Sequence, residues 1–350
     1  MNRRSDQPRP TIFPLLASPI VLILLAGAAL ADGPTVDGEF LARLGVRYRL
    51  LERKEPRPLR IHALQVDLVR AEIELGTVVA ADPDGDGPAD AALEPPEDMA
   101  RRSEAIAFIN ANPWQSVADA QGKRTTDWRK GLPVEILGLA VTAGAARTRM
   151  PEHGCAFWID GKGRPRIGEP AKGEQPVEAV SGFSQVLKDG EVVAGPDPAL
   201  HPRSALGLDR EGRTLYLAVI DGRQPGFSEG MTIREVGALL KELGAADGIN
   251  LDGGGSSILI LADKDLAHRV VNDPSTKILG KSVSRPLPDG LVLRRRRPAA
   301  TAGSHLRRTE AYPFMGPGMG AGPIASRPHH LWYAWHSSSD YPFLGSAGKF

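Results

Sequence analysis

The segment GINLDGGGSSILIL (248–261) places one carboxylate, three glycines and two hydroxyls between two apolar runs. A hairpin needs only Asp-Gly or Gly-Gly at its turn, so this loop carries more polar groups than a turn requires. Glycine permits positive φ and close backbone approach, and successive free N–H groups form a concave nest for an anion. We therefore predict an anion-binding site here, with Asp252 placed to act on the bound group. The predicted binding residues are Gly253, Gly254, Gly255, Ser256 and Ser257.

Two better-known glycine motifs do not describe this loop. A Walker loop requires Gly-Lys-Ser/Thr after the glycines, and that sequence is missing here. A Rossmann fingerprint leads into a helix, whereas Ile258–Leu261 has the pattern of a strand. For the loop taken alone, a glycine-rich turn without a function remains the alternative interpretation.

Polar side chains also lie at the ends of several other apolar runs. Asparagine, arginine and Asp-Gly are ordinary turn or rim residues, so each position has a structural explanation by itself. Their repetition is informative because strands gathered in one sheet can bring their ends together, as in many α/β sites. The positions are Asn110, Asn112, Arg203, Asp221 and Asn272.

Apolar periodicity predicts the elements that must position these residues. The clearest helix is Thr232–Leu243, where Thr232 and Glu235 form a capping box and Gly244 supplies the left-handed end. A short helix is predicted at 95–103. Residues 34–60 have the pattern of an edge strand with a connector, and 61–80 of two strands. Further strands are predicted within 105–114, 134–142, 156–159, 184–187, 204–208, 214–220 and 248–251.

The predicted architecture is one α+β domain, residues 35–297, with a mixed β-sheet and few flanking helices. The chain has 350 residues with 41% hydrophobic content, which is enough for a large core. Its 39 glycines and 30 prolines favour many short elements joined by turns. Residues 298–350 are rich in Gly, Pro, Ser and His without periodicity, which predicts a flexible tail.

The N-terminus has the pattern of an export signal. Arg3, Arg4 and Arg9 supply positive charge ahead of the apolar stretch 12–30, and Ala29-Leu30-Ala31 has the small-x-small form of a cleavage site. We therefore predict a signal peptide at residues 1–31 and a secreted or periplasmic protein. The alternative is an uncleaved anchor helix, through which alone we expect contact with a membrane.

Composition limits the partners and cofactors. With 43 basic and 42 acidic residues the net charge is +1, and no nucleic-acid module is recognisable, so nucleic acid is not expected. The single cysteine, Cys155, permits no internal disulfide. Asp82, Asp84 and Asp86 imitate the start of a calcium loop, but Glu94 falls one place late for its last ligand. We favour an acidic turn; no cofactor is certain, calcium stays open, and metal ligands remain unassigned.

Several motifs together make a family recognisable. The chain resembles the phosphodiester glycosidase family, which includes the mammalian uncovering enzyme and many exported bacterial proteins. The motifs occur in the family's order between residues 60 and 295, and the block at 230–257 is the most specific. They are INANPW (109–114), VSGFSQVLKDG (180–190), HPRSALGLD (201–209), AVIDGR (218–223), GMTIREVGALLKELGAADGINLDGGGSS (230–257), VVNDP (270–274) and RPLPDGLVL (285–293).

The resemblance implies hydrolysis of a sugar-1-phosphodiester in a cell-envelope or extracellular glycan, with a carbohydrate or phosphosugar as the partner. Such a site must bind one phosphate charge, stabilise an oxocarbenium-like transition state and position water or a nucleophile. We expect Asp252 and Asp221 to do nucleophile or base work, with the division between them undetermined. Arg203 would pair with phosphate through its fork.

The remaining assignments from the resemblance are more peripheral. Asn110 and Asn112 would orient sugar or water, and Asn272 and Arg285 are weaker positional matches. Members of the family commonly carry Gly and an aromatic residue after the first asparagine, whereas this chain has Ala111-Asn112-Pro113-Trp114, which puts the identity of the sugar in doubt. Two other functions stay open: a different glycan hydrolase on the same scaffold, and a non-catalytic glycan-binding or polysaccharide-assembly module.

Overall fold

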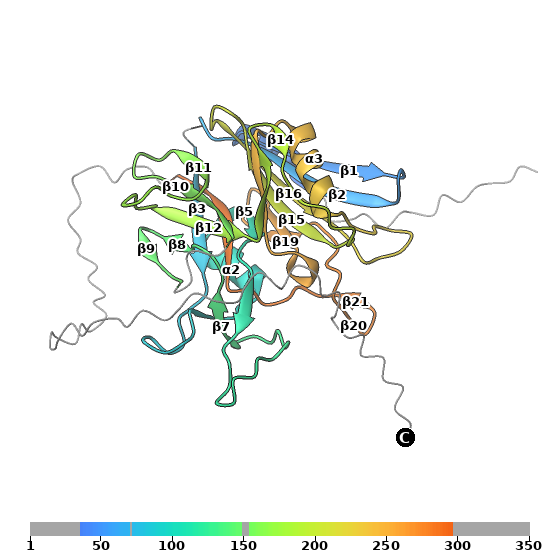
Figure 1. The fold of residues 1–350 in the computed structure, drawn as a ribbon. Helices are drawn as coiled ribbons and strands as arrows, with labels where there is room; N and C mark the ends of the chain where they lie inside the picture. Colours follow the sequence, from blue (N-terminus) through green and yellow to red (C-terminus); the bar gives the residue numbers. More distant parts are fainter. Residues whose placement is uncertain (1–35, 71, 149–153, 297–350) are drawn as a thin grey trace, which may run out of the picture. The chain divides into compact units, whose positions relative to one another are not determined.

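The computed structural model describes residues 36–70, 72–148 and 154–296. The predicted signal peptide and the predicted tail therefore lie outside the described residues. Within those ranges strands dominate, and the α-helices are α1 (Gly38–Arg43), α2 (Pro96–Arg102) and α3 (Ile233–Leu243) (Figure 1). None of the helices in this part of the chain is both long and apolar enough to cross a bilayer.

The largest sheet has seven strands, each antiparallel to its neighbours. The predicted edge strand, β1, does lie at one edge. The strand order is β1 (Val46–Arg53), β2 (Leu59–Asp67), β16 (Thr214–Ile220), β15 (Arg203–Leu208), β17 (Asp247–Asn250), β13 (Ser184–Lys188) and β14 (Glu191–Val192).

Two five-stranded sheets accompany it, and both are antiparallel. The first has the order β19 (His268–Val270), β18 (Leu259–Ala262), β5 (Ala105–Asn110), β22 (Asp289–Arg295) and β3 (Ile73–Val79). The second has the order β11 (Pro165–Gly168), β10 (Cys155–Ile159), β12 (Glu178–Gly182), β8 (Val141–Thr142) and β9 (Ala145–Ala146).

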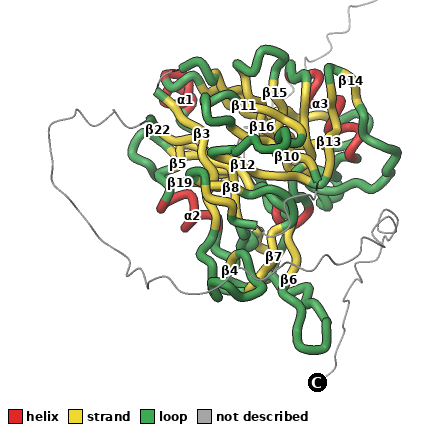
Figure 2. Tube along the Cα trace, turned by 60° about the vertical axis from the view of Figure 1, so that its left-hand side comes forward, coloured by secondary structure: helices red, strands yellow, loops and turns green. Residues whose placement is uncertain are grey.

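Two smaller units complete the described chain. Strands β4 (Ala91–Ala92), β7 (Pro133–Ile136) and β6 (Trp114–Ser116) form a three-stranded sheet, which extends below the main body in Figure 2. Strands β20 (Lys277–Ile278) and β21 (Lys281–Ser282) form a separate hairpin, seen at the lower right of Figure 1.

The apolar run of β16 is buried on both faces, which explains why it lacks polar alternation. Leu217 and Val219 pack in a cluster with Ile109 of β5 and Leu291 of β22. The seven-stranded sheet and the sheet of β5 therefore share one core, as in a sandwich. The intervening residues of β16 face the other way, where α3 covers the sheet.

Each of the two large sheets is covered by a helix on its outer face. On the sheet of β5, Met99 of α2 packs in a cluster with Phe108 and Val292. On the seven-stranded sheet, Leu239 and Leu240 of α3 pack with strand residues such as Ile220 and Ala218. The two helices thus bury the apolar sheet faces that the sandwich leaves outside.

Helix α3 has the predicted capping box. The Thr232 hydroxyl accepts the Glu235 N–H at 3.2 Å, the Glu235 carboxylate accepts the Thr232 N–H at 2.9 Å, and Gly244 ends the helix at φ +114°. The α3 connection links β16 to β17, which run in the same direction, but β15 lies between them.

The fold confirms part of the expectation and corrects the rest. A β-rich structure with few helices is confirmed, although it is more strongly β than the α+β class suggests. The expected mixed sheet is wrong, because the described strands pair only in antiparallel fashion. Helix α1, which begins at the Asp37 cap, was not predicted, since its six residues are too few to show a periodicity.

We expect Gly237→Ala to destabilise the protein even though alanine favours a helix by about 1 kcal/mol. A Cβ at Gly237 in α3 would lie 2.5 Å from the Val186 carbonyl oxygen of β13. The clash should lower the free energy of unfolding by about 1–3 kcal/mol. The control is Gly38→Ala in α1, where a Cβ meets nothing within 4 Å. Denaturant unfolding measures both, and equal effects of the two variants would contradict the packing described.

Candidate active site

The predicted loop 252–257 connects β17 to β18 and so passes from the seven-stranded sheet to the sheet of β5. It contains a short 3₁₀ turn, Gly254–Ser256, with Gly254 at φ +61°. The Gly253 N–H donates to Asp252 Oδ1 at 2.9 Å and the Gly254 N–H to the Pro202 carbonyl at 2.9 Å. The Ser256 N–H donates to the Gly253 carbonyl. These three N–H groups are paired within the protein, so they do not form the free nest that the composition suggested.

Arginine side chains lie against the glycines instead. A Cβ on Gly255 would collide with the guanidinium of Arg285, and one on Gly254 would lie 3.2 Å from an Arg223 nitrogen. The Arg203 side chain lies beside Gly253, 3.9 Å from such a Cβ. The glycines therefore serve close approach by side chains as well as turn geometry. The loop gathers positive charge from Arg203, Arg223 and Arg285.

The three arginines are held differently. The Arg203 Nε donates to the Met231 carbonyl at 2.9 Å, and one of its terminal nitrogens donates to the Ala199 carbonyl at 3.1 Å. Burial lowers the pKa of Arg203 to about 10, with Asp197 opposing the shift and Arg223 adding to it. Much of the predicted phosphate fork is thus engaged with backbone. Arg285 stacks over the Trp128 ring at 5.1 Å.

Asp252 lies among these charges at the start of the loop. Desolvation of its carboxyl raises the pKa of Asp252 to about 6. Hydrogen bonds from Ser256 and the Gly253 N–H, and the charges of Arg285 and Arg223, oppose that rise. A carboxyl with a pKa near neutrality changes its protonation state close to working pH, which suits acid–base chemistry.

The two predicted asparagines are tied to the protein. The Asn110 side chain donates to the Asp252 carbonyl at 2.7 Å and accepts from the Ser204 hydroxyl at 2.7 Å. The Asn112 side chain donates to the Leu137 carbonyl and accepts the Ser181 N–H at 2.8 Å. Both are buried and join separate sheets where the loop crosses. The contacts of Asn110 position the loop, whereas those of Asn112 tie β12 to the segment after β7. A direct contact of either side chain with sugar stays a prediction.

A further buried carboxyl, Asp289, lies beside this junction. The peptide between Ala111 and Asn112 connects it to Asp252: its carbonyl accepts the Asp252 N–H, and its N–H donates to Asp289 Oδ1 at 2.9 Å. Desolvation raises the pKa of Asp289 to about 7; the Asn112 hydrogen bond opposes this, and the Asp252 charge adds to it. Asp289 Oδ2 and the Ser257 hydroxyl are buried without a hydrogen-bond partner in the structure.

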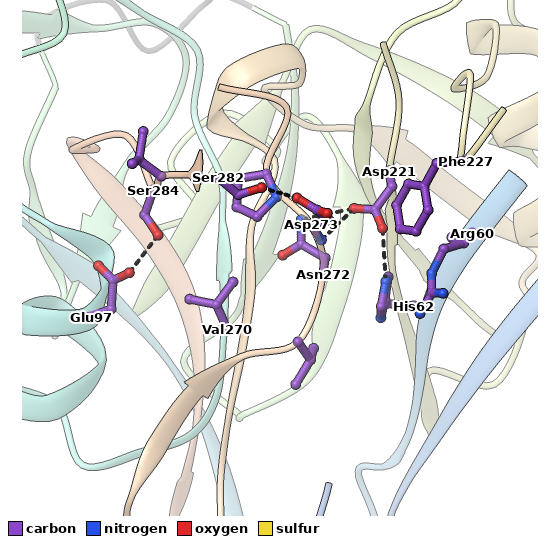
Figure 3. A pocket seen from close by; sticks show the side chains of 13 residues that line it. Arg60, His62, Glu97, Asp221, Phe227, Val270, Asn272, Asp273, Ser282 and Ser284 are labelled. Carbon is purple, nitrogen blue, oxygen red and sulfur yellow. Dashed lines mark hydrogen bonds and ion pairs between the residues drawn. The ribbon is translucent and has the colours of Figure 1, made fainter. Parts of the chain in front are cut away.

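Asp221 and Asn272 lie together in the wall of a cavity of about 690 Å³ (Figure 3). Asp221 and His62 stand on one side with Phe227 and Arg60, whereas Glu97 and Ser284 stand on the other. Asp221 accepts from His62 at 3.2 Å, the Asn272 amide at 3.3 Å and the Asp273 N–H at 2.9 Å. These neighbours enclose its carboxylate completely, with 0% of the side chain exposed.

A hydrogen-bonded chain continues behind Asp221. The Tyr48 hydroxyl lies 2.9 Å from His62 Nδ1, and desolvation raises the pKa of Tyr48 to about 12, with Arg60 opposing and Asp221 adding. The His62 ring thus joins Tyr48, which faces its Nδ1, to Asp221, which faces its Nε2. The donors around Asp221 therefore fix both of its oxygens.

Asn272 links the cavity to the glycine loop. Its amide nitrogen donates both to Asp221 and to the Ser257 carbonyl, at 3.3 and 3.2 Å, and its oxygen accepts the Leu259 N–H. The side chain thus spans the gap between the two sheets. The structure brings all the predicted site residues to this end of the sandwich, in two adjoining groups around Asp252 and Asp221.

Sequence reasoning left out four polar residues of this region. Arg223 follows Asp221-Gly222 and resembles a hairpin turn, although its proximity to a marked aspartate was a usable signal. Asp289 precedes Gly290, and this Asp-Gly pair also has the pattern of a hairpin turn. His62 occupies a core position of a strand and carries no signal in a single sequence. Asp273 lies in the VVNDP motif, but its position has the pattern of a turn.

No metal centre is evident within the described ranges, where no three His, Cys, Asp or Glu side chains gather at one spot. In the acidic turn, Asp82 accepts the N–H groups of Asp84 and Gly85, and Asp84 accepts that of Ala89. These carboxylates stabilise the turn.

Comparison with known proteins gives a family and a fold. A family model for phosphodiester glycosidase matches residues 116–294, more than half of the chain. No curated protein matches closely enough to count as a relative.

Fourteen solved chains match this one, among them the following two. One is the catalytic domain of zebrafish N-acetylglucosamine-1-phosphodiester alpha-N-acetylglucosaminidase, auto-inhibited by its pro-peptide, with 20% identity, TM-score 0.52, and 72% of this chain and 82% of that chain covered. The other is a hypothetical protein from Synechocystis, with 14% identity, TM-score 0.46, and 72% and 62% covered. At 20% identity the likeness to the zebrafish domain concerns the fold alone.

We expect Gly255→Ala to weaken anion binding without unfolding the protein. The added Cβ meets only side-chain atoms, those of Arg285 and Thr276, and a guanidinium at the end of a flexible side chain can move away. The free energy of unfolding should change by less than about 1 kcal/mol. Loss of one charge-assisted contact should weaken phosphate binding about tenfold.

Calorimetric titration with inorganic phosphate and thermal unfolding measure the two effects. The matched control is Gly195→Ala, where a Cβ meets nothing within 4 Å. Unchanged phosphate affinity in Gly255→Ala would show that Arg285 needs no approach to this glycine.

Proposed function

The chain belongs to the phosphodiester glycosidase family, and we propose that it hydrolyses the bond between the anomeric carbon of a sugar and a phosphodiester. The family supports a glycan hydrolase in general. The observation that carries the finer proposal is the gathering of three arginine side chains and Asp252 next to a sugar-sized cavity, with Asn272 bonded to both places. We further propose a substrate in a cell-envelope or extracellular glycan and a secreted or periplasmic protein, on the pattern of residues 1–31.

The arginine cluster accounts for recognition of the phosphate. Three guanidinium groups supply three positive charges, an ionised Asp252 removes one, and Asp197, 3.9 Å from Arg203, offsets part of another. The net positive charge that remains attracts a phosphodiester even while the Asp252 carboxylate is ionised. Arg223 and Arg285 lie against the loop glycines and offer planar, multiply donating groups for phosphate oxygens. Arg203, held by backbone carbonyls, contributes mainly its charge.

The cavity accounts for recognition of the sugar. Its volume falls within the range of small-molecule sites. Phe227 is 37% exposed at its wall and offers an apolar face, with Arg60 held 4.9 Å from the ring centroid. Ser284 supplies a polar group for sugar hydroxyls on the opposite wall, and Asp273 supplies another beside Asp221 (Figure 3). Since Asn272 joins the cavity to the loop, a sugar and its phosphate can occupy both places at once.

The proposed reaction requires a base more than an acid. Phosphate is a good leaving group, and the arginines stabilise the charge that it gains. Asp252, with its pKa of about 6, is ionised at neutral pH and accepts the proton of the attacking water. The water oxygen bonds to the anomeric carbon, the bond from that carbon to the phosphate oxygen breaks, and a free sugar and a phosphomonoester leave.

Asp221 takes a different role in this proposal. Its carboxylate is enclosed by three donors, so it does not touch a substrate in this conformation. It holds Asn272 and the Asp273 backbone in place, and Tyr48 and His62 hold it in turn. Asp221 is therefore a positioning residue, and the two aspartates are not equivalent.

We expect wild-type protein to release free sugar from UDP-N-acetylglucosamine or simpler sugar-1-phosphodiesters, and Asp252→Asn to lose at least about 100-fold in kcat. Because the base must be ionised, the wild-type rate should fall as pH drops through about 6, where Asp252 becomes protonated. A rate that falls as pH rises through this value would assign Asp252 as an acid instead.

The matched control is Asp265→Asn, a change of the same chemistry on the exposed surface. A parallel assay with EDTA measures any need for a chelatable metal. Release equal in wild type and Asp252→Asn would remove this aspartate from the chemistry. Absence of release from every donor would favour a different glycan bond or a binding role.

A further inference from the structure

The hairpin β20–β21 carries two adjacent apolar side chains at its tip. Ile278 is 50% exposed and Leu279 is 99% exposed. Ile278 pairs with Lys281, which leaves Leu279 and Gly280 as a two-residue turn. Single exposed apolar residues are ordinary on protein surfaces, but neighbouring ones at the end of a projecting hairpin form a small apolar tip. We call Ile278–Leu279 the apolar tip.

The backbone of Leu279 gives a second observation. Leu279 has φ +50° and Gly280 has φ +76°, the signs that a type I′ turn requires. Asn, Asp or Gly is favoured at the first central position of this turn, and leucine is disfavoured there. A leucine at position 279 is therefore unfavourable for the stability of the fold in two ways. Its positive φ is disfavoured for leucine, and its almost fully exposed side chain contributes no packing. The leucine is explained better by a contact outside the chain.

The base of the hairpin belongs to the candidate site. Lys277 is paired with Asp273 at 2.9 Å, and the Ser282 hydroxyl donates to the same carboxylate. Asp273 and Ser282 line the cavity (Figure 3). Thr276 accepts from Arg285 Nε at 2.7 Å. These contacts fix the hairpin against both the cavity and the arginine cluster, so a surface that binds the apolar tip also lies close to the site.

The charges beside the apolar tip indicate the kind of surface. Lys277 and Lys281 flank it, and Lys281 makes no ion pair within the described part of the chain. Apolar side chains bordered by lysines are typical of segments that enter the boundary of an anionic bilayer, where acyl chains receive the apolar groups and headgroups attract the cations. A hydrated polysaccharide would gain nothing from an exposed leucine.

We propose that the apolar tip docks the protein on an anionic lipid surface, with Ile278 and Leu279 in the acyl boundary and Lys281 among the headgroups. Docking would bring the cavity close to the membrane. The preferred substrates are then sugar phosphodiesters held in or against a lipid surface, a step that rests on the proposed function, whereas docking itself does not.

The test places a fluorescent reporter at the tip of the full-length chain. Leu279→Trp is compared with Leu266→Trp, because Leu266 also has positive φ, +59°, and is 37% exposed, but lies in the turn between β18 and β19. Each variant is mixed with phosphatidylcholine vesicles, with or without phosphatidylglycerol, whose acyl chains carry bromine. Wild-type protein supplies the background of the five native tryptophans.

We expect the added fluorescence of Leu279→Trp to be quenched by anionic vesicles about twofold or more, and that of Leu266→Trp to be unchanged. High salt or omission of phosphatidylglycerol should reduce the quenching. Equal quenching of the two reporters, or none at position 279, would overturn the proposal. Docking into a groove of a protein partner would give the second of these results.

A second pair of variants separates docking from folding and from catalysis. Leu279→Asn suits the turn and should raise Tm, yet weaken vesicle binding about tenfold, because an apolar group is lost from the boundary. Leu266→Asn should leave vesicle binding unchanged. Hydrolysis of a soluble substrate should be the same in both. Unchanged vesicle binding in Leu279→Asn contradicts docking alone, whereas an inactive wild type that still binds vesicles contradicts the proposed hydrolysis alone.

Discussion

The site depends on how closely arginine side chains approach one loop. Between Asp252 and Ser257 the chain leaves the seven-stranded sheet and enters the sheet of β5, and here Arg223 and Arg285 lie against glycine backbone that tolerates no Cβ without displacement. The same crossing places Asp252 among those charges. The loop must therefore meet two conditions. It must consist of glycine where the arginines approach it, and it must cross between the sheets so that the Asp252 carboxyl lies beside those arginines.

Buried polar groups surround this crossing, and burying them costs free energy unless they are paired. Three buried asparagines offset this cost with hydrogen bonds: Asn110, Asn112 and Asn272. Each donates to a backbone carbonyl and accepts a hydrogen bond from a backbone N–H or a hydroxyl group. Asp221 is satisfied by three donors. The apolar core between the two large sheets provides the stability that lets this end of the sandwich remain polar. The paired polar side chains hold the loop and the strand ends in place. By contrast, Asp289 Oδ2 and the Ser257 hydroxyl, which have no hydrogen-bond partner in the structure, lie next to Asp252 or in its loop.

Much of this arrangement follows from the sequence, because it rests on local patterns. Thr232 and Glu235 predict the capping box of α3, and the three glycines predict the loop 252–257. Strand pairing is harder to predict from the sequence. A helix between β16 and β17 suggests that these strands are parallel neighbours, but β15, which comes earlier in the chain, lies between them in the sheet. Long-range pairing also hides residues. His62 looks like a core position and Asp289 like a turn, since only the fold brings His62 to Asp221 and Asp289 to the Asp252 junction.

The claim that this site cuts the bond from the sugar carbon to the phosphate oxygen can be tested directly by the fate of water. Hydrolysis of a sugar-1-phosphodiester in water enriched in heavy oxygen, followed by mass spectrometry of the phosphomonoester, distinguishes attack at carbon from attack at phosphorus. The account predicts a phosphomonoester without heavy oxygen, because the water oxygen joins the sugar. Heavy oxygen in the phosphomonoester would mean that the arginine cluster activates phosphorus, and would contradict a glycosidase mechanism.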